Sequence, residues 1–512
     1  MNHHSVFSLV VFLLLLFSEL SSIAQGERKV VKLVRSDVSE YDKSIIDAQR
    51  VKGNVMFIYE GTQFFCDSAH IFSNKDFNAY GNIRIIKPGE FNVTAGWMKV
   101  DQKKKIATLG ENVVLKDNQM TLTSPSLFYA IDSEVASYNA GGKIVSNANK
   151  NILTSKEGSY HTKTETFFFR KNVVLKNPDY TVNSDTLRYH DRTEVAYFFG
   201  PSTLKGKDSD IYCENGWYDT KKEICQFNKN ALVRSEKTIL KGDSIYYNGE
   251  KGFGEVFKNA VIRDTTTNFF ISGEYGYHVE SSKLSLITDH ALLTQIFEDG
   301  DSLFLHADTL RSQPDSSNKD VLYAYRGVRF FKTDMQGVCD SMKYAISDST
   351  LALFSKPVMW SDENQITGDT IIVTTSKNKI DRMFVRYNGF IISQSDTAHF
   401  NQIKGRNIDS KFVDNELRSV YIEGNGQLIY FPEEESSDSL PSKIIGMNQG
   451  ECSNIHLSIE DNAIKRIRLE REANSKFQPM KLTDPKTFLL DGFKWTENIR
   501  PKNKKDVFLK PD

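Results

Sequence analysis

Residues 229–262 read KNALVRSEKTILKGDSIYYNGEKGFGEVFKNAVI, and they hold one complete copy of a unit that recurs along the chain. The unit starts at Asn230 and returns at Asn259, 29 residues later. Its opening phrase, of the type (G/K)-N-(V/A)-x-(L/I), recurs about every 30 residues from roughly residue 53 to residue 430. Self-similarity at such a period is the signature of a repeat architecture, so the sequence predicts a solenoid-like protein.

The register of the repeat holds across most of the sequence. Earlier copies of the phrase are anchored at Asn54, Asn82, Asn112 and Asn172, and looser copies begin near Gly327, Lys356, Asn388 and Gly424.

Within a unit, apolar residues alternate with polar ones as they do in β-strands. Val113 and Leu115, or Val173 and Leu175, follow their anchors with a period of two, which is typical of a strand with one buried face. A second phrase follows about a dozen residues later, as in CDSAHIF from Cys66. Each unit is therefore predicted to form two or three short strands joined by tight turns, giving an all-β fold of about 30-residue units.

The ends of the chain differ in composition from the repeats. An apolar run from Val6 to Phe17 precedes Ser22-Ile23-Ala24, which fits a secretory signal and its cleavage site. PEEESSDSLPS, from Pro432, has linker composition, and the last residues are rich in Lys and Pro. We predict six segments: a signal peptide at 1–24, a lead-in at 25–45, the repeats at 46–431, a linker at 432–442, a terminal β segment at 443–495 and a flexible tail at 496–512.

The charge balance argues against nucleic-acid binding, and the positions of the cysteines argue against a disulfide framework. With 65 basic and 66 acidic residues, the protein lacks the basic excess of a nucleic-acid binder. Cys66, Cys213, Cys339 and Cys452 fall on one repeat position that small residues fill elsewhere, which favours buried free thiols over disulfides. Cys213 and Cys225 flank a predicted hairpin, and the sequence leaves open whether they pair.

The sequence carries no recognisable catalytic, phosphate-binding or metal-binding motif. Scattered histidines such as His70 and His190 are interpreted as strand-face residues rather than metal ligands. Acids recur at one repeat position, and we interpret them as capping local backbone N–H groups and facing water; they are Asp67, Asp185, Glu214, Asp243, Glu274, Asp308, Asp340 and Asp369. No enzyme activity, cofactor or metal is predicted.

The apolar stripe is the candidate functional feature. In a thin closed solenoid it would fill the core, whereas between two splayed layers it would line a groove able to hold acyl chains, since burying each CH₂ is worth about 0.8 kcal/mol. The sequence alone does not separate these cases. The groove candidates are Val55, Phe57, Ile83, Ile85, Val113, Leu115, Val173, Leu175, Ile262, Phe330, Trp360 and Ile392.

Two stretches of the sequence resemble the OstA-like, or organic-solvent-tolerance, family: GNVMFIYEGTQFFCDSAHIF, which begins at Gly53, and residues 229–262. In both, an Asn-led strand, an Asp-Ser pair, an aromatic residue and a turn recur in order. The family includes the periplasmic bridge protein of lipopolysaccharide transport and the amino-terminal domain of the outer-membrane translocon. The resemblance covers most of residues 45–430. It implies a V-shaped β-jellyroll, or β-taco, that binds lipid A acyl chains inside and joins other jellyrolls through its open ends.

Two departures from the family qualify what it implies. The sequence is much longer than that of a typical bridge protein, and it lacks the long carboxy-terminal series of amphipathic strands that a translocon barrel needs. We therefore expect a bridge-like protein of a Gram-negative periplasm, without its own barrel, that transports lipopolysaccharide towards the outer-membrane translocon. The alternatives are a secreted structural or adhesive β-solenoid with a filled core, and a β-helical enzyme acting on polysaccharide.

Overall fold

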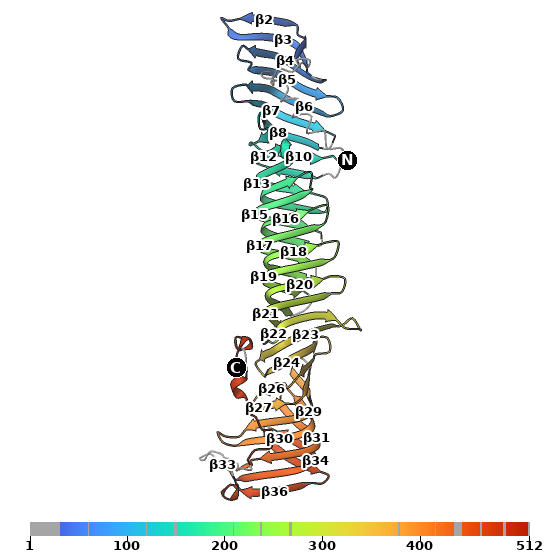
Figure 1. The fold of residues 1–512 in the computed structure, drawn as a ribbon, viewed down its shortest axis with the longest axis vertical. Coiled ribbons are helices and arrows are strands. Elements are labelled where there is room, and N and C mark those ends of the chain that lie inside the picture. The colour runs from blue at the N-terminus through green and yellow to red at the C-terminus, as the bar shows by residue number, and fades with distance from the viewer. Residues whose placement is uncertain are drawn as a thin grey trace, which may run out of the picture. The chain divides into compact units, whose positions relative to one another are not determined.

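The structure is a computed structural model. It describes residues 31–509 except 60, 119, 148–150, 208, 236–237, 266–268, 377–378, 415, 435–442, 461–462 and 485–487. The predicted signal peptide and most of the predicted linker lie outside the described residues. The protein divides into two compact units: Met1–Glu236 with Ser244–Glu250, and Lys237–Asp243 with Lys251–Asp512. Figure 1 shows that both are built almost entirely of strands.

The first unit is an antiparallel ladder in which each long strand pairs with its neighbours in sequence. Its strands are β1 (Lys32–Arg35), β2 (Val38–Asp42), β3 (Ile46–Tyr59), β4 (Thr62–Phe72), β5 (Phe77–Lys87), β6 (Phe91–Asp101), β7 (Ile106–Asp117), β8 (Met120–Ala130), β9 (Val135–Tyr138), β10 (Gly142–Ser146), β11 (Ile152–Ser155), β12 (Glu157–His161), β13 (Thr166–Lys176), β14 (Tyr180–His190), β15 (Val195–Gly206), β16 (Ser209–Asp219) and β17 (Ile224–Ser235), with a 3₁₀ turn, η1 (Thr162–Thr164). The bounds of β18 (Thr238–Asn248) fall in both units.

The second unit continues the same antiparallel pattern. Its strands are β19 (Phe253–Asp264), β20 (Phe269–Val279), β21 (Leu284–Ile296), β22 (Ser302–Pro314), β23 (Asp320–Lys332), β24 (Met335–Ala345), β25 (Thr350–Phe354), β26 (Val358–Ser361), β27 (Asn364–Thr367), β28 (Thr370–Ser376), β29 (Lys379–Gln394), β30 (Phe400–Val413), β31 (Glu416–Tyr430), β32 (Glu433–Glu434), β33 (Lys443–Ile444), β34 (Gly446–Glu460), β35 (Ala463–Glu470) and β36 (Asn474–Pro479), followed by the 3₁₀ turns η2 (Met480–Leu482), η4 (Glu497–Ile499) and η5 (Asp506–Phe508).

The all-β repeat predicted from the sequence is confirmed, but the unit differs from the one expected. It is a hairpin of two long strands, and the Asn-led phrase lies in the middle of a strand rather than at its start. Gly53 and Asn54 of β3 both have positive φ and stand opposite the single residue Asp67 of β4. This is a β-bulge, which bends the strand sharply. We call this bend the corner; it divides each long strand into halves that belong to two facing limbs.

The predicted looser copies of the phrase are corners too. Positive φ recurs at Arg326 and Gly327, Ser355 and Lys356, Tyr387 and Asn388, and Gly424 and Asn425. Asn suits the second position because its side chain tolerates the left-handed region better than most residues.

The repeated acids take a partner that the sequence analysis missed. Rather than only capping local backbone, the acid of one strand accepts a hydrogen bond from the corner Asn of another. The Nδ2 of Asn82 donates to Asp67 at 2.8 Å, and Asn259 donates to Asp243 at 3.1 Å. The same pairing joins Asn54 to Asp37, Asn230 to Glu214 and Asn388 to Asp369. The acid row is thus part of the structure of the corner.

The carboxy-terminal residues also differ from the prediction. We expected 496–512 to be a flexible tail. Instead, the segment 488–509, which we call the strap, packs on the second unit and is hydrogen-bonded to it, as in the bonds from Arg329 to the carbonyl oxygens of Ile499 and Asp506. The predicted terminal β segment at 443–495 is not separate from the repeats either, because β34 pairs with β31 along nearly its full length.

Each unit has an edge made of short strands. Among the described pairings, β1 and β2 pair with β3, and β35 and β36 pair with β34. No described helix is long and apolar enough to cross a membrane.

Candidate functional site

The inward face of the limbs carries the predicted apolar stripe. Inward side chains occupy the first and third positions after each corner, as Val113 and Leu115 do after Asn112. Ten of the twelve groove candidates have this placement. Nine of the ten are buried, and Leu175 is half-buried. We use the term mouth for the side of the interior opposite the corners.

Trp360 and Ile392 are corrections to the prediction, because both lie on the outer face. Trp360 pairs with Gln336, one residue away from Gly337, which pairs with both Phe330 and Met359. Directly paired residues point to the same face, so Met359 shares the inward face with Phe330. Likewise, Ile391 rather than Ile392 occupies the third position after its corner.

Proline explains the error at Trp360. Aligning the repeats places Pro357 in the slot of the corner Asn, but the proline ring fixes φ near −65°. The positive-φ pair therefore falls one residue earlier, at Ser355 and Lys356. A shift of one residue moves every following side chain of a strand to the other face.

The interior is filled at the amino-terminal end of the first unit. One continuous cluster of buried side chains extends from Val51 to Ile131. Phe57, Phe64 and Phe77 meet there, with ring centroids 5.6–6.0 Å apart. At these positions the stripe forms an ordinary packed core.

Farther along the same unit, the interior is less covered at its mouth. At the first position after the corner, Val173, Ser202 and Ala231 are buried. At the third position, Leu175, Leu204 and Val233 are only half-buried. Apolar side chains of β13, β15 and β17 thus form a row that faces the interior yet keeps part of its surface in solvent.

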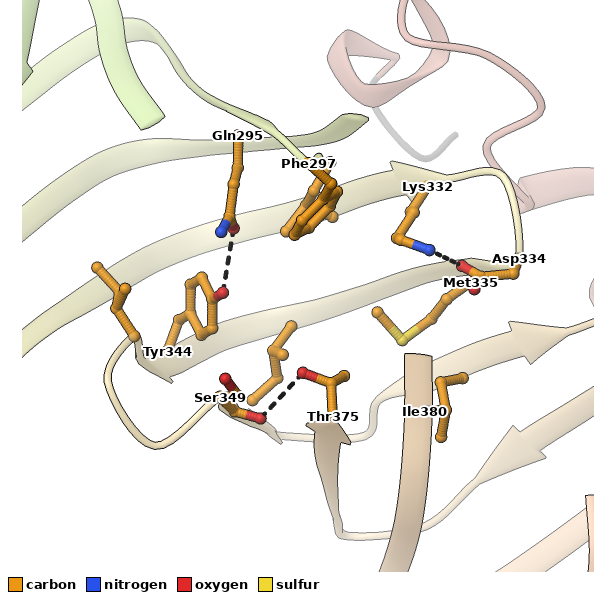
Figure 2. Close-up of a pocket in the computed structure, with 12 residues that line it drawn as sticks. Gln295, Phe297, Lys332, Asp334, Met335, Tyr344, Ser349, Thr375 and Ile380 are labelled. Carbon is orange, nitrogen blue, oxygen red and sulfur yellow. Dashed lines mark hydrogen bonds and ion pairs between the residues drawn. The ribbon is translucent and has the colours of Figure 1, made fainter. Parts of the chain in front are cut away.

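In the second unit, side chains from opposite limbs meet across the mouth (Figure 2). Tyr344, beyond the corner of β24, donates a hydrogen bond of 3.0 Å to Gln295, beyond the corner of β21. Burial raises the pKa of Tyr344, so its hydroxyl stays protonated and remains a donor. The space beside this bridge is only about 80 Å³.

A buried ion pair lies beside this bridge. Lys332, only 6 % exposed, contacts Asp334 at 2.6 Å and Asp301 at 3.3 Å. Figure 2 shows Lys332 pointing towards Asp334, with Phe297 and Met335 nearby. Two carboxylates offset the cost of burying this ammonium group. The mouth is closed here by both polar and apolar groups.

A larger hollow lies between β29 and β35 of the same unit. Its volume is about 880 Å³, and its apolar lining includes Ile391, Ile403 and Leu457. Acidic side chains stand at its rim, and burial and nearby carboxylates raise the pKa of one of them, Asp362.

Within the described residues, no group of three or more His, Cys, Asp or Glu side chains is arranged to hold a metal ion. All five cysteines are free and buried, including Cys213 and Cys225. Burial raises the pKa of the thiols of Cys66, Cys225 and Cys339 to about 12 and that of Cys213 to about 11, which keeps them protonated and unreactive.

Comparison with known proteins identifies the amino-terminal repeats. Among solved structures, this protein is similar to LptH from Pseudomonas aeruginosa, described as the LptA homologous periplasmic component of the conserved lipopolysaccharide transport device. The identity is 11%, the match covers 28% of this sequence and 95% of that one, and the TM-score is 0.22. No curated protein matches the sequence. The model of the OstA-like protein family matches residues 28–185. The family resemblance expected from the repeated Asn and Asp phrases over most of residues 45–430 is therefore confirmed over residues 28–185, which match the model of the OstA-like family.

Proposed function

We propose that this protein is a non-enzymatic lipid-binding bridge of the periplasm, which holds acyl chains of lipopolysaccharide in its interior on the way to the outer membrane. The observation that carries the proposal is the half-buried row Leu175, Leu204 and Val233. These side chains face inward and are only partly covered, so an acyl chain lying on them would remove apolar surface from water. Burying four CH₂ groups there would gain about 3 kcal/mol.

The OstA-like match supports this choice of ligand, because part of the row lies within the matched residues. Leu175 falls inside residues 28–185, whereas Leu204 and Val233 extend the same row beyond it. The headgroup of a bound lipid would project through the mouth into water.

The strand edges support the proposed partners. β1 with β2, and β35 with β36, are the edge strands of the described pairings, and exposed strand edges recruit further strands. We propose that other β-jellyroll proteins of the transport system, and the outer-membrane translocon, dock there edge to edge. The predicted signal peptide would direct the protein to the periplasm.

Photocrosslinking in cells tests the proposal. A photoreactive amino acid is placed at Leu175, Leu204 or Val233, and adducts are detected by a lipopolysaccharide blot. Val174, on the opposite face of β13, is the matched outward control. Leu115 is the matched inward control, because it holds the same repeat position but is only 5 % exposed.

We expect adducts at Leu175, Leu204 and Val233, and none at Val174 or Leu115. Adducts at Val174 as strong as those at Leu175 would indicate surface adhesion instead. A folded, exported protein that gives no adduct at any of the three positions would contradict lipid binding by this row.

A structural or adhesive solenoid is the second candidate. The packed cluster from Val51 to Ile131 favours it, because a filled core is what a purely structural repeat requires. The crosslinking experiment separates the two candidates, since a structural solenoid would give no lipid adduct at any inward position.

A further inference from the structure

The strap lies on the outer face of the second unit and covers an apolar row there. Phe390 and Ile392 of β29 and Phe431 belong to one buried cluster with Leu490 of the strap. Phe488, Phe493 and Trp495 pack against this cluster. The ring of Phe400 lies 5.2 Å from Phe493 and 5.3 Å from Trp495. Figure 1 shows the carboxy-terminal residues beside β24–β27, in the same unit.

Two buried glutamines bind the strap through its backbone. The Nε2 of Gln365 donates to the carbonyl oxygen of Lys494 at 2.6 Å, and its Oε1 accepts from the backbone N–H of Thr496 at 2.7 Å. Gln402 repeats the arrangement with the carbonyl oxygen of Phe488, at 2.7 Å, and the N–H of Leu490, at 2.8 Å. Both glutamines are 0 % exposed. Each carboxamide therefore bonds the C=O of one strap residue and the N–H of the second residue after it.

Cationic groups of the face extend this pattern. Arg329 donates to the carbonyl oxygens of Ile499 and Asp506 at 2.8 and 3.1 Å, and Lys404 donates to that of Asp491 at 2.8 Å. The contacts from the sheet to the strap are thus largely made to backbone atoms. A site that bonds backbone groups and packs apolar side chains between them has the properties of a binding groove for a peptide segment.

The glutamines follow the period of the repeat. Gln336, Gln365 and Gln402 each stand four residues before the single residue that lies opposite a positive-φ pair, which is Asp340, Asp369 or Arg406. Gln336 also contributes, because its Oε1 accepts from Arg500 of the strap at 2.9 Å. Gln449 holds the same position before Ser453 in the next unit, where it is exposed.

We propose that the outer face of β22–β31 is a binding groove for an aromatic-rich peptide of irregular conformation, and that the strap is its resident and exchangeable ligand. The groove recognises the backbone C=O and N–H groups of residues two apart and the apolar side chains between them. The proposal does not depend on lipid binding inside the jellyroll, because the groove and the interior lie on opposite faces of the limb.

Peptide exchange on the full-length protein tests the proposal. A protease recognition sequence is inserted between Lys486 and Thr487, and the folded protein is cut there. A fluorescent synthetic peptide of residues 488–509 is then titrated in, and its binding is followed by anisotropy. We expect the cut protein to retain its strap at first, and then to exchange it for the labelled peptide with saturable binding.

Two changes identify the basis of that binding. Replacing both Gln365→Ala and Gln402→Ala should weaken peptide binding at least tenfold, whereas the matched change Gln449→Ala should leave it unaltered. A peptide N-methylated at Leu490 and Thr496 keeps every side chain but loses both donated N–H groups, so it should weaken binding similarly in the unmutated protein. This second arm stays informative if the double variant fails to fold.

Two results would overturn the proposal. One is a cut, folded protein that neither releases its strap nor takes up the labelled peptide. The other is uptake that is insensitive both to N-methylation and to the glutamine replacements.

Discussion

Replacing a corner glycine with alanine should lower the free energy of unfolding more than the same replacement at a loop glycine of similar φ. Gly81, with φ +74°, sits in the corner of β5, and a Cβ there would lie 2.2 Å from an Oδ of Asp67. Gly61 has φ +78°, and a Cβ there would meet nothing within 4 Å. The two glycines therefore share the backbone requirement and differ in their surroundings.

The expected costs follow from these surroundings. Gly61→Ala should lower the free energy of unfolding by about 1–2 kcal/mol, the cost of a left-handed conformation for a residue with a Cβ. Gly81→Ala carries the same strain and also pushes Asp67 away from Asn82, whose hydrogen bond of 2.8 Å is then lost. Losing that bond adds about 0.5–1.5 kcal/mol, for a total of about 1.5–3.5 kcal/mol.

Native-state hydrogen exchange of amides in β4 and β5 measures these losses locally. Repeating Gly81→Ala in an Asp67→Gly background provides the control, because the three atoms nearest to the added Cβ, the Oδ, Cγ and Cβ of Asp67, are then all absent. The cost of Gly81→Ala should fall there to that of Gly61→Ala. Equal costs for the two glycine variants in the unmodified background would refute the idea that the Asn–acid pair stabilises the corner.

Three further predictions concern the interior and its thiols. Tyr344→Phe removes the hydrogen bond to Gln295 across the mouth, so it should lower the free energy of unfolding by about 1 kcal/mol and speed exchange of the β24 amides; unchanged exchange would mean that the bridge does not hold the limbs together. Phe330→Ala should cost about 3–5 kcal/mol, because the ring is fully buried; a cost below about 1 kcal/mol in urea unfolding would show that the interior collapses freely. Cys213 and Cys225 should resist a thiol reagent at pH 8 until the protein is unfolded. Because their folded pKa values of about 11 and about 12 lie above the ordinary 9.0, their stabilising contribution is complete below pH 9 and declines as the pH rises through 11–12; rapid labelling of the folded protein, or stability that does not decline there, would contradict this burial.

The repeat could be predicted from the sequence because its signals are local. Alternation after Asn112 or Asn172 specifies a strand with one buried face, and the spacing of the anchors specifies the unit. Whether Gly-Asn or Lys-Asn ends a strand or bends it is not a local property. The same two residues would also fit a turn between strands. They form a bulge only because the neighbouring strand continues past them, as β4 does where Asp67 lies opposite Gly53 and Asn54.

The errors in the stripe have a similar origin. Because successive side chains of a strand alternate between its two faces, an error of one residue in the position of the corner reverses every assignment after it. Aligning Pro357 with the corner Asn therefore assigns Trp360 to the wrong face. The information needed to avoid that error was present, since proline is incompatible with positive φ. The predicted copy of the phrase begins near Asn388, but Asn388 is the second residue of its corner, so Ile391 and not Ile392 holds the third position.

The strap was missed for a different reason, because its partners lie far away in the sequence. Lys- and Pro-rich composition predicts a loose tail when it is read locally, and Gln365 and Gln402 precede their strap partners by 129 and 86 residues. One signal was available. Glutamine recurs at a single repeat position in consecutive units, where a solvent-facing strand would accept many polar residues. Such a recurrence on an outer face indicates that something covers it, and in this protein the cover is its own carboxy-terminal segment.

The two faces of the second unit therefore achieve closure by different means. At Tyr344 and Gln295 the inward face is closed across the mouth by side chains of opposite limbs, whereas a hollow of about 880 Å³ lies between β29 and β35. The outward face is closed by a segment bonded through its backbone. Closure across the mouth is undone only when the two limbs move apart. Closure by the strap can be undone by removing that one segment while the strands stay paired. If lipid is carried inside, its passage through the second unit therefore depends on separating the limbs at Tyr344, and displacing the strap alone would not open that path.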